Sequence, residues 1–555
     1  MEPTILAVIA VVVVIGLSTV SDRLGIAPPL ILMLVGVGIS FLPFVAPIEI
    51  EPEWILAVIL PPLLYGAAIA IPTVDFRRDF TAVGGLAVAL VVISAVVMGY
   101  LIHLLLPGVS LPLGIALGAI LSPTDAAATT IVRRLGVTPR VRIILQGESL
   151  LNDATALVLL RSAIAATAGV VSFWGVVADF LWAALAAAVI GVVIGWLGVQ
   201  VRRLIRDSAP ATAISFLIPF IAYIPAEVVD ASGLVAVVAA GLVTAQQGPK
   251  LLNAQQRLAE RASWHTVEFL LEGVVFLAMG LELKFFIVDI NGNHETIWLA
   301  VGIAALTIVV TLVLRGGYIA ALIRGTQHSS SRKIERSEVM KRGDVPGEER
   351  ERNRREEALM ERRAQMRARL RDSSSHDERN EHRLRYFSTL IQRYIADAEY
   401  LIRQPLGLKE GSLLTWAGMR GVVTLAAAQT LPHSVSHRSL MILIAFFVAA
   451  GSLVIQGGTL GLFAKKLGLV NQDTEPEGER ERLREELNQV VLDWKPPEGK
   501  VIPEERIPLA HLRAQRKAVL ELRSTGTYSS RCLARVLNEL DAEEMGIQVR
   551  LSQGE

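Results

Sequence analysis

The sequence predicts an all-α protein that crosses a membrane many times. Hydrophobic residues make up 52% of its 555 positions. They gather in runs of about 20 residues, the length at which a helix spans the hydrocarbon core of a bilayer. These runs recur from residue 4 to about 466, with one long charged interruption. The ten-residue alternation of apolar and polar residues that is typical of a membrane β-barrel is absent from the sequence.

The apolar runs predict about thirteen spans. Their approximate limits are 4–20, 27–45, 54–72, 81–106, 113–132, 143–165, 173–199, 211–228, 232–247, 265–283, 296–323, 411–432 and 439–463. The first run follows the letters MEPT rather than the basic segment that begins a cleaved signal peptide, so we expect it to remain as a span.

The basic residues of the short loops alternate from one side of the membrane to the other. Most of them follow odd-numbered spans, as Arg133 and Arg142 follow the fifth span, whereas the loops after even-numbered spans hold only Lys284 and Arg438. Because Lys and Arg concentrate in cytoplasmic loops, this alternation predicts an external N-terminus and a cytoplasmic C-terminus in a multi-pass protein of the cell membrane.

Four regions follow from this pattern. Residues 1–324 hold spans 1–11, residues 325–410 form a charged cytoplasmic insert, residues 411–466 hold spans 12 and 13, and residues 467–555 form a cytoplasmic helical tail. We expect a solvated helix in the centre of the insert and an amphipathic helix over 386–402. In the tail we expect helices over about 475–493, 508–523 and 528–543.

The tail contains no motif of an enzyme or a phosphate-binding loop, and nothing in the sequence points to a nucleic-acid partner or a cofactor. A regulatory or assembly role for the tail and a purely structural one are both open. The single cysteine, Cys532, excludes a disulfide framework and a cysteine metal site.

Six ionisable residues lie deep in the predicted spans, where each costs about 3 kcal/mol or more. They are Asp125, Glu148, Asp153, Arg161, Arg315 and Arg420. Some such residues only hold helices together, but three acids and three arginines on four spans favour a functional site. On span 6, Glu148, Ser149, Asn152 and Asp153 fall within an arc of about 140°. Their oxygens suit small hard cations. A dehydrated carboxylate there would hold a proton or a cation but hardly both, which gives exchange if the site faces each side in turn.

Spans 5 and 12 each contain a break in mid-membrane. Pro123 interrupts span 5 just before Thr124 and Asp125, and Gly418 and Gly421 flank Arg420 in span 12. Such a pair of interrupted spans, crossing in opposite senses, is typical of an inverted-repeat transporter. Asp125 would then face positive half-helix N-termini and Arg420 negative C-termini.

Arg315 in span 11 is the natural partner of Glu148, and this pair would leave Asp153 as the titrating group. For Arg161 we expect snorkelling or helix packing rather than ion binding. Glu227, Glu268 and Glu272 could line an access funnel, although acids near span ends are usually solvated. The isolated His103 and His265 do not indicate a metal site.

Three motifs carry a family resemblance. "SPTDAAATTIVRRLGV", "GESLLNDATALVL" and "WAGMRGVVTLAAAQTLP" resemble the cation:proton antiporter-1 family of sodium/proton exchangers, over roughly residues 4–466. The resemblance implies a thirteen-helix homodimer with a dimerisation domain and a six-helix core domain that moves like an elevator. In that core two broken helices cross near the ion site.

The resemblance also implies roles for single residues. Asp153 would carry Na⁺ or protons, helped by Ser149 and the backbone of Thr124, with Asn152 beside it. Glu148 would pair with Arg315, and Asp125 and Arg420 would compensate the broken-helix ends. Asn152, where electrogenic relatives have an acid, implies electroneutral exchange. Two departures are Ala126, where many relatives have proline, and a long insert before span 12.

The resemblance therefore predicts a Na⁺/H⁺ antiporter that serves sodium transport and pH homeostasis and is not an enzyme. A K⁺/H⁺ or Li⁺/H⁺ antiporter of the same fold is the nearest alternative. A cation channel is more distant, because the sequence has no repeated filter loop. An intramembrane enzyme would need a metal motif or a Ser-His or Cys-His pair that the spans do not offer.

Overall fold

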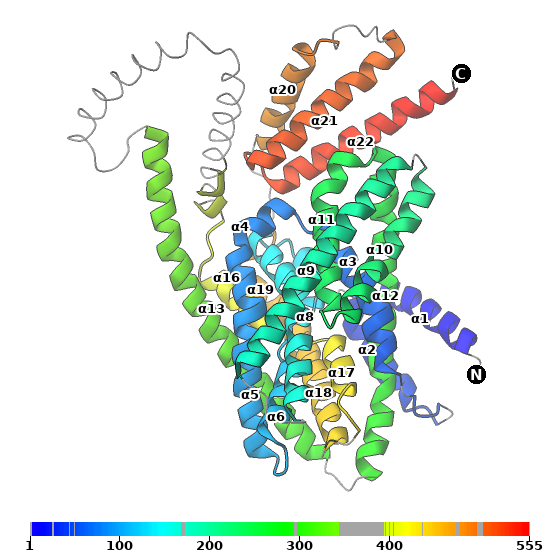
Figure 1. Ribbon diagram of the computed structural model, residues 1–555, viewed down its shortest axis with the longest axis vertical. Coiled ribbons are helices and arrows are strands. Elements are labelled where there is room, and N and C mark those ends of the chain that lie inside the picture. Colours follow the sequence, from blue (N-terminus) through cyan, green and yellow to red (C-terminus); the bar gives the residue numbers. More distant parts are fainter. Residues whose placement is uncertain are drawn as a thin grey trace, which may run out of the picture. The chain divides into compact units, whose positions relative to one another are not determined.

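The structure is a computed structural model, and the residues that it describes form a helical protein (Figure 1). It describes the chain except for residues 1–2, 25–26, 44, 49, 168–172, 206, 293–296, 343–392, 394–395, 399, 403, 434, 436, 473–477, 497–502 and 554–555. The chain falls into two compact units. The first comprises Met1–Leu322, Gly407–Thr474 and Asp541–Glu555, and the second comprises Ile323–Leu406 and Glu475–Leu540.

The apolar runs of the sequence form the helices of the first unit. In chain order these are α1 (Pro3–Leu24), α2 (Pro28–Ser40), η1 (Trp54–Ile59), α3 (Leu60–Ala70), α4 (Thr73–Gly84), η2 (Gly85–Leu90), α5 (Val91–Leu105), α6 (Leu111–Leu121), α7 (Ala127–Arg134), α8 (Pro139–Thr167), α9 (Phe173–Leu204), α10 (Ser208–Val228), α11 (Gly233–Leu251), α12 (Ala254–Gly292), α13 (Ile297–Arg342), α16 (Leu408–Trp416), α17 (Val422–Gln429), α18 (Arg438–Ser452), η4 (Leu453–Gly457) and α19 (Gly458–Leu467). Helix α13 continues into the second unit.

Six helical stretches of the described chain are long and apolar enough to cross a membrane. They are Thr73–Leu105, Pro139–Thr167, Val177–Leu204, Ser208–Val228, Ile297–Thr326 and Arg438–Leu467. Shorter apolar helices cover Ala10–Ser21, Pro28–Ser40, Trp54–Ala70 and Leu111–Leu121. The chain is therefore a multi-pass membrane protein, and the count of thirteen spans stays a prediction.

Both predicted helix breaks are present. Helix α6 ends at Leu121 and α7 begins at Ala127, while α16 ends at Trp416 and α17 begins at Val422. Proline has no backbone N–H to continue the helix, which accounts for the first break at Pro123. The two non-helical segments meet each other, because the Asp125 N–H donates a hydrogen bond of 2.8 Å to the Met419 carbonyl.

Two helices are longer than the spans that hydropathy predicts. Helix α12 has 39 residues where the predicted span covers 265–283, and α13 has 46 residues where the predicted span covers 296–323. Hydropathy marks only the part of a helix that can lie in hydrocarbon. The flanking Gln, Arg, Glu and Lys residues are good helix formers, so the helices continue past the apolar run.

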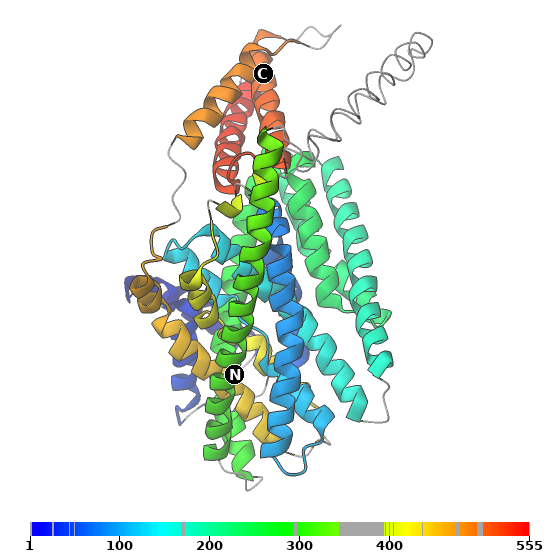
Figure 2. The ribbon, with the colours of Figure 1, turned by 90° about the vertical axis from the view of Figure 1, so that its left-hand side faces the viewer.

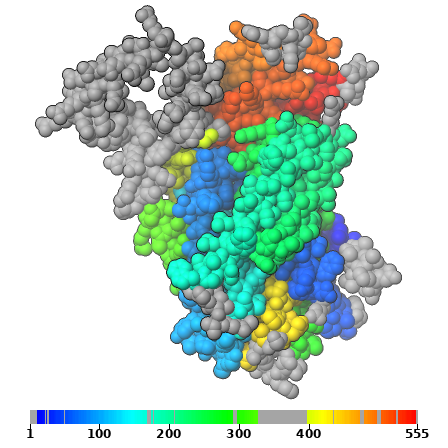
Figure 3. All heavy atoms as spheres, in the orientation of Figure 1, coloured from blue at the N-terminus to red at the C-terminus, as the bar shows by residue number. Residues whose placement is uncertain are grey.

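One side of the first unit presents apolar side chains to its surroundings. In Figures 2 and 3, α9 and α10, coloured between cyan and green, form an outer face of this unit. On α9, Trp174, Trp182, Leu185, Val189 and Trp196 are exposed. Such a face is stable only against lipid or against another apolar protein surface.

The second unit contains the helices predicted for the tail. These are α20 (Glu479–Leu492), η5 (Glu504–Arg506), α21 (Ile507–Thr525) and the start of α22 (Ser530–Gln553). Glu479 holds the start of α22 by accepting hydrogen bonds from Ser529 N (2.8 Å) and Ser529 Oγ (2.7 Å). Of the helices predicted in the insert, the one in its centre lies outside the described residues. The amphipathic one over 386–402 lies largely outside them.

Candidate functional site

Helix α8 carries the polar cluster that the sequence singled out. Glu148, Ser149, Asn152 and Asp153 are all buried, with at most 8% of each residue exposed. Their spacing along a helix of 3.6 residues per turn keeps them on one side of α8. That side faces the interior of the first unit, where the broken segments between α6 and α7 and between α16 and α17 lie.

The predicted ion pair between Glu148 and Arg315 is present. Arg315 Nη2 lies 2.8 Å from Glu148 Oε2, and Arg315 Nη1 bonds Glu148 Oε1, so both carboxylate oxygens are engaged. Arg315 is 2% exposed and Glu148 is 1% exposed. The Arg315 Nε also donates to the Leu414 carbonyl at 2.8 Å, near the end of α16. The pair therefore neutralises Glu148 and ties α8 and α13 to the broken helix.

Asn152 braces the other broken segment. Its Nδ2 donates to Thr124 Oγ1 at 2.8 Å and to the Thr124 carbonyl at 3.3 Å. The Thr124 hydroxyl in turn donates to Glu148 Oε1 at 3.1 Å. The Oδ1 of Asn152 is buried and has no hydrogen-bond partner among the described residues. The side chain thus fixes the chain just before Asp125, and one amide oxygen is left over.

Asp125 and Arg420 lie at the ends of the half-helices. Asp125 Oδ1 accepts a hydrogen bond of 2.9 Å from the Ala127 N–H at the start of α7, and the Val422 N–H at the start of α17 also donates to this carboxylate. Arg420 Nε donates to the Leu121 carbonyl at 3.0 Å, at the end of α6. Each charge faces the helix end of opposite partial charge, the arrangement that the macrodipole favours.

The glycines beside Arg420 make room for charged side chains. A Cβ atom built on Gly421 would lie 1.3 Å from Asp125 Oδ2, which no real contact allows. A Cβ built on Gly418 would lie 2.6 Å from Arg315 Nε. These two glycines are therefore required because the carboxylate and the guanidinium pass directly over the backbone of the second break.

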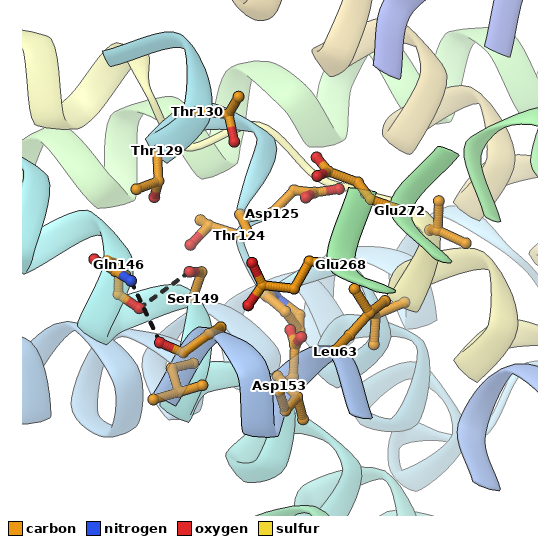
Figure 4. Close-up of a pocket in the computed structure, with 18 of the residues that line it drawn as sticks. Leu63, Thr124, Asp125, Thr129, Thr130, Gln146, Ser149, Asp153, Glu268 and Glu272 are labelled. Atoms are coloured by element: carbon orange, nitrogen blue, oxygen red, sulfur yellow. Dashed lines mark hydrogen bonds between the residues drawn. The ribbon is translucent and has the colours of Figure 1, made fainter. Parts of the chain in front are cut away.

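Asp153 faces a cavity rather than a partner. The cavity has a volume of about 320 Å³, and Thr124, Asp125 and Ser149 line it together with Asp153. Figure 4 shows Asp125 of the broken segment, Asp153 of α8, and Glu268 and Glu272 of α12 around this space. Within the described part of the chain, no residue forms a hydrogen bond or an ion pair with Asp153. An unpaired carboxylate at this depth needs a proton or a cation to offset its charge.

The cavity is also lined by charged and polar residues outside the predicted ion-binding set. Arg133, Arg142 and Gln146 contribute to its lining, as do Glu268 and Glu272 on α12. The two glutamates line this cavity whereas Glu227 lines another, and a role in an access funnel stays a prediction. The two arginines and Gln146 were missed. Arg133 lies at the end of α7 and Arg142 and Gln146 lie in the first turns of α8, so their only signal was their closeness in sequence to the broken helix.

Arg161 joins α8 to α10, a contact that agrees with the helix-packing role expected for it. Its Nη2 lies 2.8 Å from Glu227 Oε2, so it forms an ion pair with the end of α10. The signal in the sequence was that both residues lie near the same end of their predicted spans. His103 has a structural contact, because its Nδ1 lies 2.6 Å from the Val109 carbonyl. No group of three or more His, Cys, Asp and Glu side chains that could hold a metal occurs in the described residues.

Comparison with known proteins identifies the group to which these features belong. Residues 8–344 match the family described as sodium/hydrogen exchanger, transmembrane. An uncharacterised Na⁺/H⁺ exchanger of Escherichia coli is 35% identical over 331 residues, which cover 57% of this chain and 60% of that protein. A sodium, potassium, lithium and rubidium/H⁺ antiporter of Bacillus subtilis is 30% identical over 289 residues, covering 50% of this chain and 43% of that protein.

A solved structure supports the same fold. The sodium proton antiporter of Methanocaldococcus jannaschii superimposes with a TM-score of 0.56 at 18% identity, covering 84% of this chain and 99% of that one. At this identity the likeness speaks for the fold alone.

Proposed function

The chain belongs to the sodium/hydrogen exchanger family, and from this premise we propose that it exchanges Na⁺ for H⁺ across the cytoplasmic membrane. The observation that carries the proposal is Asp153, a buried carboxylate that faces a cavity and has no partner among the described residues. The chain matches only 60% of the length of the E. coli relative. The ion and the mechanism are therefore argued from the site.

Asp153 is the carboxylate that binds Na⁺ and H⁺ in turn. Arg315 neutralises Glu148, and backbone N–H groups at two helix starts stabilise Asp125. This leaves Asp153 to be neutralised by what enters the cavity. Ser149 and Thr124 line the same space and supply further oxygens for a small hard cation. One carboxylate that holds either ion exchanges one charge for one charge, which makes the cycle electroneutral.

The cavity opens on the cytoplasmic side. Arg133 and Arg142 line it, and basic residues concentrate in cytoplasmic loops. On the opposite side of Asp153, Leu157 and Leu160 line a gap too narrow for a water molecule. Alternating access then consists of closing the cavity and widening this gap. This orientation puts the N-terminus outside and the C-terminus inside.

We further propose the architecture that the family resemblance implies. The chain has thirteen spans, with residues 1–324 and 411–466 in the membrane and the insert 325–410 and the tail 467–555 in the cytoplasm. Its dimerisation domain pairs two copies, and the exposed apolar side chains of α9 suit a surface that lies in the membrane. The crossing segments near Asp125 and Met419 belong to the core that moves.

A wider cation range is the second candidate. The Bacillus subtilis relative is named for sodium, potassium, lithium and rubidium. The cavity of about 320 Å³ has room for several waters and does not by its size exclude the larger alkali ions. The oxygen ligands favour hard cations without choosing among them.

The test is proton movement in proteoliposomes that contain the full-length protein and a trapped pH-sensitive dye. Adding Na⁺ to one side should drive protons across the membrane, and dissipating the membrane potential with an ionophore should not slow the exchange. Adding K⁺, Li⁺ or Rb⁺ in separate experiments ranks the ions. If K⁺ drives more proton movement than Na⁺, K⁺ is the preferred substrate instead of Na⁺. Current that flows without proton coupling would point to a channel instead.

Electroneutrality can be tested at Asn152. Asn152→Asp adds a second carboxylate beside Asp153. The cation-loaded and proton-loaded forms of the protein can then differ in net charge. We expect transport by this variant to respond to membrane voltages imposed with K⁺ and valinomycin, whereas the wild type does not. A variant that still transports and remains insensitive to voltage would remove Asn152 from this role.

A further inference from the structure

At the end of α8 opposite the cavity mouth, Arg161 and Glu227 join two helices. Arg161 lies on α8, and Glu227 lies on α10, with their charged atoms 2.8 Å apart. Both side chains line a second cavity of about 260 Å³, together with Leu157 and Leu160 of α8. The pair is accessible to solvent, because the Arg161 side chain is 57% exposed and the Glu227 side chain 27%.

The two partners belong to different sets of helices, Arg161 to α8 and Glu227 to the corner between α10 and α11. Glu227 Oε1 accepts a hydrogen bond of 2.9 Å from the Gly233 N–H, so the carboxylate is held at the corner between α10 and α11. Arg161 follows Asp153 by eight residues, which places it about 12 Å farther along the same helix. Any movement of α8 that carries Asp153 relative to α10 and α11 must therefore stretch or break this pair.

The space between the pair and Asp153 is closed. Asp153, Ala156, Leu157 and Leu160 line a gap that holds no water-sized space. Ala156 itself is 3% exposed. In this structure Asp153 is therefore open toward Arg133 and shut toward Arg161.

We propose that the Arg161–Glu227 pair is a latch that keeps the external entrance shut while Asp153 faces the cytoplasm. The inference rests on the proposed alternating-access function and adds a residue pair that controls it. The pair forms in the inward-open state and opens in every transport cycle.

An arginine and two glutamates also lie near each other on the side of Asp153 away from Arg161. Arg133 lies on α7, while Glu268 and Glu272 lie on α12, and all three line the open cavity. Within the described residues Arg133 forms no ion pair. When the cytoplasmic side closes, Arg133 approaches these glutamates, so one pair can form as the other opens. Each entrance thus has an arginine on a helix next to the site, α7 or α8, and a glutamate on a neighbouring helix, α12 or α10.

The strength of the pair suits a device that must open on each turnover. Solvent-exposed ion pairs contribute little, and their loss shifts an equilibrium by about fivefold at most. A buried pair such as Glu148–Arg315 would hold too firmly to open in each cycle.

The experiment measures how fast a thiol in the closed gap reacts from outside. Cys532 is the only cysteine, so Cys532→Ser gives a cysteine-free chain into which Ala156→Cys is introduced as the reporter. Right-side-out membrane vesicles are treated with a membrane-impermeant thiol reagent. The rate is then compared among Arg161→Gln, Glu227→Gln, the double variant and Arg161→Lys.

We expect each glutamine variant to raise the labelling rate about two- to fivefold, the range that loss of an exposed ion pair allows. The double variant should match the single ones, because both lose the same contact. Arg161→Lys, which keeps the charge, should stay near the parent. Asp230→Asn is the matched control: it removes a carboxylate from the turn just after α10 without touching the pair, and it should leave the rate unchanged.

Equal labelling rates in the parent and in both glutamine variants would overturn the latch, and so would an effect of Asp230→Asn as large as theirs. The labelling does not depend on the transported ion. If no cation drives proton movement in the wild type but the variants label faster, the proposed function fails, and only the part of the inference that the pair keeps the gap shut stands. If the wild type exchanges ions but the labelling never changes, the latch alone fails.

Discussion

We expect Asp153→Asn to reduce cation-driven proton movement to the level of protein-free liposomes. Asparagine keeps the size and shape of the side chain, but it can neither release a proton nor offset the charge of a cation. The other acids near the centre of the site do not replace it, because Glu148 is bound to Arg315 and Asp125 faces two helix N-termini. The measurement is the dye assay with each alkali cation in turn.

The same variant should remain folded. Replacing an unpaired buried carboxylate by an amide removes a charge that the interior disfavours, so the melting temperature in detergent should equal or exceed that of the wild type. Asp179→Asn is the matched control, since it makes the same change at an exposed position of α9 and should leave transport intact. If Asp153→Asn still exchanges ions, the role passes to Glu268 or Glu272, which line the same cavity. Their glutamine variants would then be the ones to lose activity.

How far the sequence could predict this site depends on whether a feature is local to one segment. The breaks at Pro123 and around Arg420 follow from residue types that cannot continue a helix or that leave it weak, and the structure has both. The shared face of Glu148 and Asp153 follows from helical geometry. The Glu148–Arg315 pair follows from the cost of a buried charge, because few deep arginines were available to meet it.

Features that depend on how separate helices pack could not be predicted in the same way. Asn152 was expected beside Asp153, but its bonding partners could not be named: its Nδ2 donates to Thr124, and its Oδ1 has no hydrogen-bond partner among the described residues. Arg161 was expected to snorkel or to take part in helix packing, but its partner, Glu227, lies 66 positions away in the sequence and could not be named. Neither contact has a periodic signal in the chain. The extension of α13 to Arg342 was missed for another reason: hydropathy does not report where a helix ends in water.

Removing Arg315 should have the largest effect on folding. In Arg315→Ala the Glu148 carboxylate stays buried without its cation, and breaking a buried ion pair on one side costs about 3–5 kcal/mol. The Leu414 carbonyl near the end of α16 loses its donor at the same time. We expect a lower yield of folded protein and a melting temperature well below that of the wild type, measured in detergent. Arg324→Ala, an exposed position on the same helix, should change stability by no more than about 0.5 kcal/mol.

The double variant Arg315→Ala with Glu148→Gln separates two contributions of the arginine. If its main contribution is to neutralise Glu148, the neutral glutamine removes the buried charge and should restore part of the lost stability. If its main contribution is to hold the broken helix through Leu414, the double variant should be as unstable as Arg315→Ala alone. Because Nη1 and Nη2 of the guanidinium engage both oxygens of Glu148 while Nε bonds the helix end, we expect partial rescue rather than full rescue. Arg315→Lys should likewise fall short of the wild type, since an ammonium group cannot make the two parallel bonds.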